Sequence, residues 1–141
     1  MNRTDDGGRA SKTAHLVWLA VFAGLLLTLI GVRFLVVPAG AVRTFGLPGT
    51  DASASGALEA VIAFRDIWLG VLLVAFAALG EWRAAGLWLI LAVGVCWADA
   101  VLVATSGGHW AAVGFHVGSG IFCLVLGRAA LLAARRGGPG T

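Results

Sequence analysis

Four long apolar stretches constrain this chain of 141 residues more than any other feature of its sequence. Each is close to the roughly 20 residues that an α-helix needs to cross the hydrocarbon core of a bilayer. The expected helices cover residues 14–37, 57–79, 84–105 and 110–132. We therefore expect an all-α fold, an integral membrane four-helix bundle over residues 14–132. A polar tail (residues 1–13) precedes it and a basic tail (residues 133–141) follows it.

The composition supports a membrane location and excludes several classes of protein. Hydrophobic residues make up 60% of the chain and charged residues 12%, whereas soluble domains carry about 25% charged residues. This excludes a soluble enzyme, a disordered chain and a nucleic-acid-binding module, so the expected partner is the lipid bilayer and no nucleic acid. The sequence has no H-E-x-x-H pattern, Walker loop or strand followed by G-x-G-x-x-G, so we expect no metal and no cofactor.

Basic residues are distributed unevenly over the expected loops and tails. Arg43 lies in the longest loop, residues 38–56, which is rich in Gly, Ser and Pro. The helix ends that share a side with the two termini carry most of the others: Arg3, Arg9, Lys12, Arg83, Arg128, Arg135 and Arg136. The positive-inside rule then predicts that both termini are cytoplasmic. We expect a multi-pass protein of the bacterial inner (cytoplasmic) membrane.

Ionisable residues inside the apolar stretches are the strongest indication of a functional site. They are Arg33, Arg65, Asp66, Asp99 and His116, with Glu59 near the start of the second stretch. A charge at the centre of a membrane helix costs about 2.5–3.5 kcal/mol, so these side chains should face the interior of the bundle. With a rise of about 1.5 Å per residue, each helix places one such group in the same layer of the outer half of the bilayer. The sequence therefore predicts a polar pocket.

Several pairings within this layer are consistent with the sequence. Neighbouring residues on a helix point about 100° apart, so Arg65 is not expected to pair well with Asp66. We expect Arg65 or Arg33 to pair with Asp99 and Asp66 to approach His116, and the sequence does not choose between such pairings. As alternatives, the Arg33 side chain extends to the membrane–water interface, or the buried charges serve only to fix the packing of the helices.

The residue types of this layer suit proton transfer and the stabilisation of negative charge. We expect an enzyme that moves protons on a lipophilic small molecule, as an isomerase or cyclase does. Asp66 or Asp99 would be the acid or base, with His116 as its partner and Arg65 as an electrostatic anchor. The alternatives are a protein that binds or transports a small molecule or lipid, and a structural membrane protein.

Other residues are candidates for the wall of the pocket or for packing. We assign substrate binding to Arg33, Glu59, Trp68 and Trp97, although the two tryptophans fit helix packing as well. Cys96 and Cys123 lie in apolar runs and are interpreted as core residues. Gly114 and Gly118 form a G-x-x-x-G pattern almost opposite His116 on the fourth helix, which predicts a contact with a second copy in a homodimer.

The order of several short motifs resembles that of a known family. They are Gly31-Val-Arg33-Phe followed by Pro38, then Phe45-Gly46, Phe64-Arg65-Asp66-x-x-x-Gly70, Ala98-Asp99 and His116. Over residues 16–130 the chain is similar to small four-helix integral membrane proteins of unknown function from bacteria and fungi, and the Arg-Asp-x-x-x-Gly run is the most specific part. The resemblance implies four membrane helices and indicates Arg33, Arg65, Asp66, Asp99 and His116 as site residues, with no activity attached.

Overall fold

The computed structural model describes residues 3–48 and 56–137, and within these ranges all of its regular secondary structure is helical. Its helices are α1 (Arg3–Val36), α2 (Pro38–Phe45), α3 (Gly56–Ala78), α4 (Trp82–Thr105) and α5 (Trp110–Gly137). Four segments are long and apolar enough to cross a membrane: Ala14–Val36, Glu59–Ala78, Trp82–Thr105 and Trp110–Arg136. The all-α fold with four candidate spans is thus confirmed, and the spans indicate a multi-pass membrane protein.

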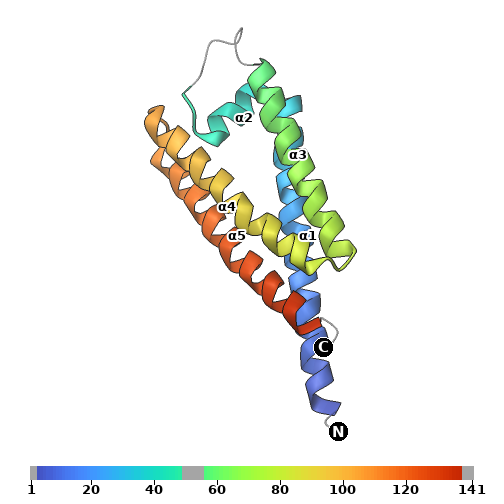
Figure 1. Ribbon diagram of the computed structural model, residues 1–141. Helices are drawn as coiled ribbons and strands as arrows, with labels where there is room; N and C mark the ends of the chain where they lie inside the picture. The colour runs from blue at the N-terminus through green and yellow to red at the C-terminus, as the bar shows by residue number, and fades with distance from the viewer. Residues whose placement is uncertain (1–2, 49–55, 138–141) are drawn as a thin grey trace.

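The long helices form two antiparallel pairs, α1 with α3 and α4 with α5 (Figure 1). The pairs lie close together at the end of the bundle where α1 begins and α5 ends. They diverge toward the other end, where α2 lies between them. The contacts within each pair are extensive and those between the pairs are few, so the space between the pairs is where a site can form.

Small residues allow the helices of each pair to approach closely. A Cβ atom at Gly70 of α3 would collide with Thr28 Oγ1 and the Gly24 carbonyl of α1. In the other pair, a Cβ at Gly127 of α5 would lie 3.1 Å from the carbonyl oxygen of Gly86 on α4. Close backbone packing of this kind stabilises helix association in lipid. Moving an apolar side chain from lipid into a helix interface contributes little free energy, because both environments are apolar. The glycine of the Arg-Asp-x-x-x-Gly run therefore has a packing role.

Helix α2 corrects the expectation that residues 38–56 form only a loop. Pro38 occupies the first turn, where its fixed φ and missing N–H are tolerated, and Gly46 ends the helix in the left-handed conformation with φ of 103°. Ala41, Val42 and Phe45 are buried against Phe34, Ala63 and Val103. This apolar face folds α2 back onto the bundle.

The ends of the first and last helices also differ from the sequence-based boundaries. Helix α1 begins at Arg3, so most of the expected N-terminal tail is helical, and α5 continues to Gly137 through the expected basic tail. Hydrophobicity marks where a helix can enter lipid, whereas the backbone hydrogen bonds of a helix continue beyond that point. The arginines and alanines at the end of α5 are good helix formers.

Candidate functional site

A cavity of about 640 Å³ lies between the two helix pairs, and all five helices contribute to its wall. This volume lies within the range of roughly 300–1,000 Å³ typical of small-molecule sites. Most of the wall is apolar. The ionisable residues that line it are Arg33, Arg65, Asp66, Asp99 and His116. The layer of titratable groups expected from the sequence thus lines one cavity.

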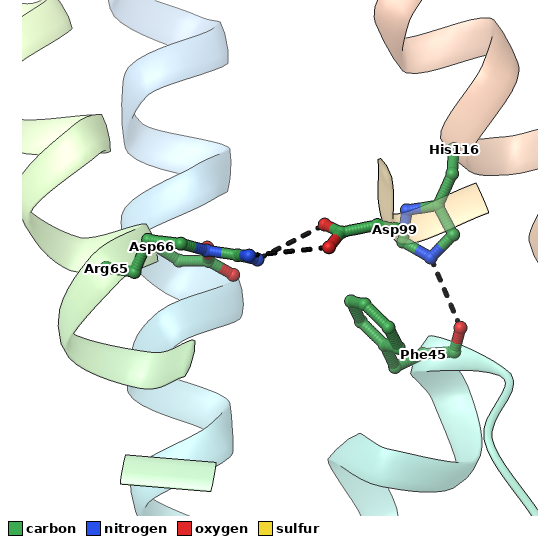
Figure 2. Close-up of polar contacts among 5 residues, drawn as sticks. All are labelled: Phe45, Arg65, Asp66, Asp99 and His116. Atoms are coloured by element: carbon green, nitrogen blue, oxygen red, sulfur yellow. Dashed lines mark hydrogen bonds and ion pairs between the residues drawn. The ribbon is translucent and has the colours of Figure 1, made fainter. Parts of the chain in front are cut away.

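Arg65 of α3 connects the two helix pairs through an ion pair with Asp99 of α4 (Figure 2) and also pairs with Asp66 on its own helix. Its Nη1 and Nη2 donate to the two oxygens of Asp99 on α4 at 3.3 and 3.2 Å, in the bidentate geometry that matches a guanidinium to a carboxylate. Its Nε donates to Oδ1 of Asp66 at 2.9 Å. The Arg65–Asp99 pairing is confirmed. The expectation that Arg65 and Asp66 pair poorly was wrong, because the long arginine side chain turns its Nε edge toward the neighbouring carboxylate.

His116 is buried and forms its hydrogen bond with α2. Its Nε2 lies 3.2 Å from the carbonyl oxygen of Phe45, and the two rings lie 4.6 Å apart (Figure 2). A carbonyl oxygen only accepts, so Nε2 is the donor, and Nδ1 of a neutral imidazole is then an acceptor. Helix α2, which was not foreseen, supplies the hydrogen-bond partner of His116, and among the described residues no hydrogen bond or ion pair joins His116 to Asp66.

Arg33 lies at the end of the cavity next to α2. Its Nη2 donates to Oγ1 of Thr44 at 3.1 Å, and the Thr44 hydroxyl donates to the carbonyl of Gly40 at 2.9 Å. Both Arg33 and Thr44 line the cavity. The contact with Thr44 holds the guanidinium at this end of the wall.

Three of the residues assigned to substrate binding are not part of the cavity wall. Glu59 is buried, about 10 Å along the axis of α3 from Asp66. Trp68 is 62% exposed on another face of α3, and Trp97 packs with its indole nitrogen against Gly120 of α5. Glu59 is therefore on an inward face but outside the layer of the cavity, whereas the two tryptophans lie near that layer on other faces of their helices.

Other lining residues were missed or interpreted differently. Cys96 of α4 and Cys123 of α5 are free thiols that line the wall. Gly114 and Gly118 also line the cavity, and an added Cβ at either would meet nothing within 4 Å. The absence of their side chains widens the cavity, and their contact with a second copy stays a prediction. Phe115, Ser119 and Phe122 are spaced so that they share one face of α5, and this spacing in the sequence could have indicated that the face lines a cavity.

The cavity opens sideways between α1 and α5. The lining residues Phe22 and Leu26 of α1 are 64% and 43% exposed, and Phe115 and Phe122 of α5 are 59% and 42% exposed. A molecule dissolved in the bilayer can therefore reach the cavity without crossing water. Within residues 3–48 and 56–137, no group of three or more His, Cys, Asp or Glu side chains is arranged to hold a metal ion.

One comparison with known proteins identifies relatives of the chain. A family model described as Domain of unknown function (DUF4267) matches residues 24–130. No curated protein and no solved structure matches the chain. The matched range includes all five ionisable residues of the cavity wall.

Proposed function

We propose that this chain, which belongs to the DUF4267 family, binds a lipophilic small molecule in the cavity between its two helix pairs. The observation that carries the proposal is that the Arg65–Asp99 ion pair spans the space between the helix pairs without filling it. Charges that served only to join helices would be surrounded by side chains. Here they border an apolar-walled cavity that opens toward lipid between α1 and α5.

A photoactivatable probe tests this proposal. Purified full-length protein in detergent is irradiated with a diazirine derivative of hexadecanol, and the labelled residues are mapped by mass spectrometry. We expect saturable labelling of Leu26 and Ser119 on the cavity wall. Leu91, which is 76% exposed and does not line the cavity, reports non-saturable labelling from the surrounding detergent.

Two matched variants make the experiment specific to the cavity. Gly118→Leu places a large side chain in the cavity and should abolish the saturable labelling. Gly94→Leu places the same side chain in open space on α4, away from the wall, and should leave the labelling unchanged. Equal labelling of Leu26 and Ser119 in both folded variants would contradict a binding cavity.

A second candidate function is proton transfer on the bound molecule, as in an isomerase or cyclase. The geometry of His116 favours it, because Nε2 donates to Phe45 and Nδ1 remains an acceptor. Nδ1 or a carboxylate of Asp66 or Asp99 would remove a proton from one carbon of the ligand. A proton would return at another carbon, and Arg65 would stabilise the intervening negative charge on a ligand oxygen. The composition of the ligand is unchanged.

Heavy water reveals such a reaction without knowledge of the substrate. The protein is incubated with a bacterial lipid extract in D₂O, and molecules that gain deuterium are identified by mass spectrometry. The wild type and Gly94→Leu should incorporate deuterium into one class of molecule, whereas Asp66→Asn, Asp99→Asn and His116→Gln should not. If the wild type incorporates no more deuterium than these three variants, proton transfer is excluded and binding is left as the function.

The orientation in the membrane is part of the same proposal. The basic residues at the end where α1 begins and α5 ends favour a cytoplasmic location of both termini, in a bacterial inner membrane. A membrane-impermeant thiol reagent should label Ser106→Cys in intact spheroplasts and Glu81→Cys only after permeabilisation. The reverse labelling pattern would mean that both termini lie on the outer side of the membrane.

A further inference from the structure

Arg33 and Arg65 differ in how their charges are neutralised. Arg65 contacts two carboxylates, and with both of them ionised the three side chains together carry one net negative charge. Arg33 lines the same cavity, and among the described residues it forms no ion pair; it donates to the neutral hydroxyl of Thr44. A guanidinium has five N–H donors, so most of those on Arg33 are available to another acceptor. The cavity therefore has a cationic position separate from its anionic one.

The Thr44 hydroxyl orients Arg33 without competing for an acceptor. Its proton is donated to Gly40, so its oxygen serves Arg33 as an acceptor only. An anionic group on a ligand would thus bind Arg33 directly. Carboxylates and phosphates are the groups for which a guanidinium is best suited, because they accept two parallel hydrogen bonds.

An apolar groove leads away from Arg33 along the cavity. Ile30, Leu26 and Phe22 follow it at intervals of four residues on α1, on the face that lines the cavity. Phe115, Ser119 and Phe122 form the opposite side on α5. The distance along α1 from Arg33 to Phe22 is about 16 Å, since each residue adds about 1.5 Å. This is an elongated, laterally open apolar surface next to a cation.

We infer that the ligand is a single-chain amphiphile with an anionic end group, either a carboxylate or a phosphate. Arg33 binds the end group, and the chain lies in the groove between α1 and α5. The inference rests on the proposed binding function and specifies its ligand class. Arg65, Asp66 and Asp99 contact the side of the molecule rather than its anionic end, because their net negative charge disfavours an anion.

Competition among four molecules with the same chain tests this inference. Palmitic acid, hexadecyl phosphate, hexadecanol and hexadecylamine each compete with the photoactivatable hexadecanol for Leu26 and Ser119 of the full-length protein in detergent. We expect the two anionic molecules to compete at concentrations about tenfold lower than the alcohol, the scale of a charge-assisted hydrogen bond. The positively charged amine should be the weakest competitor.

Variants at the same end of the bundle separate a specific contact from general attraction. Arg33→Gln should remove the preference for the anionic molecules, and Arg33→Lys should retain part of it. Arg43→Gln is the control, because Arg43 is an exposed cation of α2 that bonds to the Ala39 carbonyl and does not line the cavity. It should leave the preference unchanged.

The outcomes distinguish this inference from the proposed function. Equal competition by all four molecules, a preference for the amine, or an equal effect of Arg43→Gln and Arg33→Gln would overturn the anionic ligand while leaving a binding cavity. If the probe itself gives no saturable labelling that Gly118→Leu removes, the binding function fails first.

Discussion

Within each helix pair the backbones meet directly, whereas between the pairs the Arg65 side chain spans an open space. Within a pair, glycines let the carbonyl groups of one helix approach the backbone of the other. Between the pairs, the Arg65–Asp99 ion pair crosses the cavity. Apolar side chains of all four long helices pack together where the pairs converge, in the cluster that includes Leu16, Leu73, Leu89 and Leu126. In lipid, close packing stabilises helix association and apolar contact alone contributes little. Each pair is therefore closely packed along its length, whereas the interface between the pairs is packed at one end and open around the cavity at the other.

The largest expected effect is on the interface between the pairs. Arg65→Gln leaves Asp66 and Asp99 as uncompensated carboxylates, and we expect the free energy of unfolding to fall by about 3 kcal/mol. Thermal unfolding of the purified protein in detergent, followed by circular dichroism, measures this loss. Adding Asp99→Asn should restore part of the stability. An unchanged unfolding temperature in Arg65→Gln would mean that the ion pairs do not hold the pairs together.

A substitution inside one pair should have a somewhat smaller effect. Gly70→Ala forces a Cβ against Thr28 and the Gly24 carbonyl, and we expect it to destabilise the protein by about 2 kcal/mol. Gly94→Ala is the control, since its Cβ meets open space and the higher helix propensity of alanine should stabilise the protein by about 0.5–1 kcal/mol. The same unfolding measurement applies, and two effects of the same sign would contradict the close packing at Gly70.

The contact of α2 with α5 should contribute less again. His116→Ala removes the hydrogen bond to the Phe45 carbonyl and the ring contact, and we expect a loss of about 1 kcal/mol. Hydrogen exchange should become faster at the backbone amides of α2, because His116 holds this helix against α5. His109→Ala in the exposed turn between α4 and α5 should leave this exchange unchanged, and an equal increase in both variants would refute a specific contact.

The smallest effect on stability is expected at Arg33. Its exposed side chain contacts a neutral hydroxyl, so Arg33→Gln should change the free energy of unfolding by less than about 0.5 kcal/mol. Together with a loss of preference for anionic amphiphiles, this would separate ligand binding from the packing of the bundle. A loss of stability close to that of Arg65→Gln would instead make Arg33 part of the structural network.

Part of the site could be predicted from the sequence because burying charge in lipid is so costly. Arg33, Arg65, Asp66, Asp99 and His116 stood out in apolar runs, and counting residues along the helices placed them in one layer. Their partners could not be predicted in the same way. A long arginine side chain reaches its own neighbour as readily as another helix, as the contact of Arg65 with Asp66 illustrates.

Helix α2 was the main omission, and it changed the interpretation of several residues. Pro38 and Gly46 are the start and stop signals of a short helix, but the polar and glycine-rich residues that follow obscured them. Without α2, Thr44 and Phe45 had no visible place in the site. The structure makes them the partners of Arg33 and His116.

The sequence by itself determined that four helices can cross a membrane and that their charged residues must avoid lipid. Both conclusions follow from transfer energies that depend only on residue type and on position along a helix. The tertiary structure alone decided that the helices form two pairs, that these diverge around a cavity, and that α2 lies between them. Those features depend on which helix faces meet, and small residues such as Gly70 set this through contacts with residues remote in the chain.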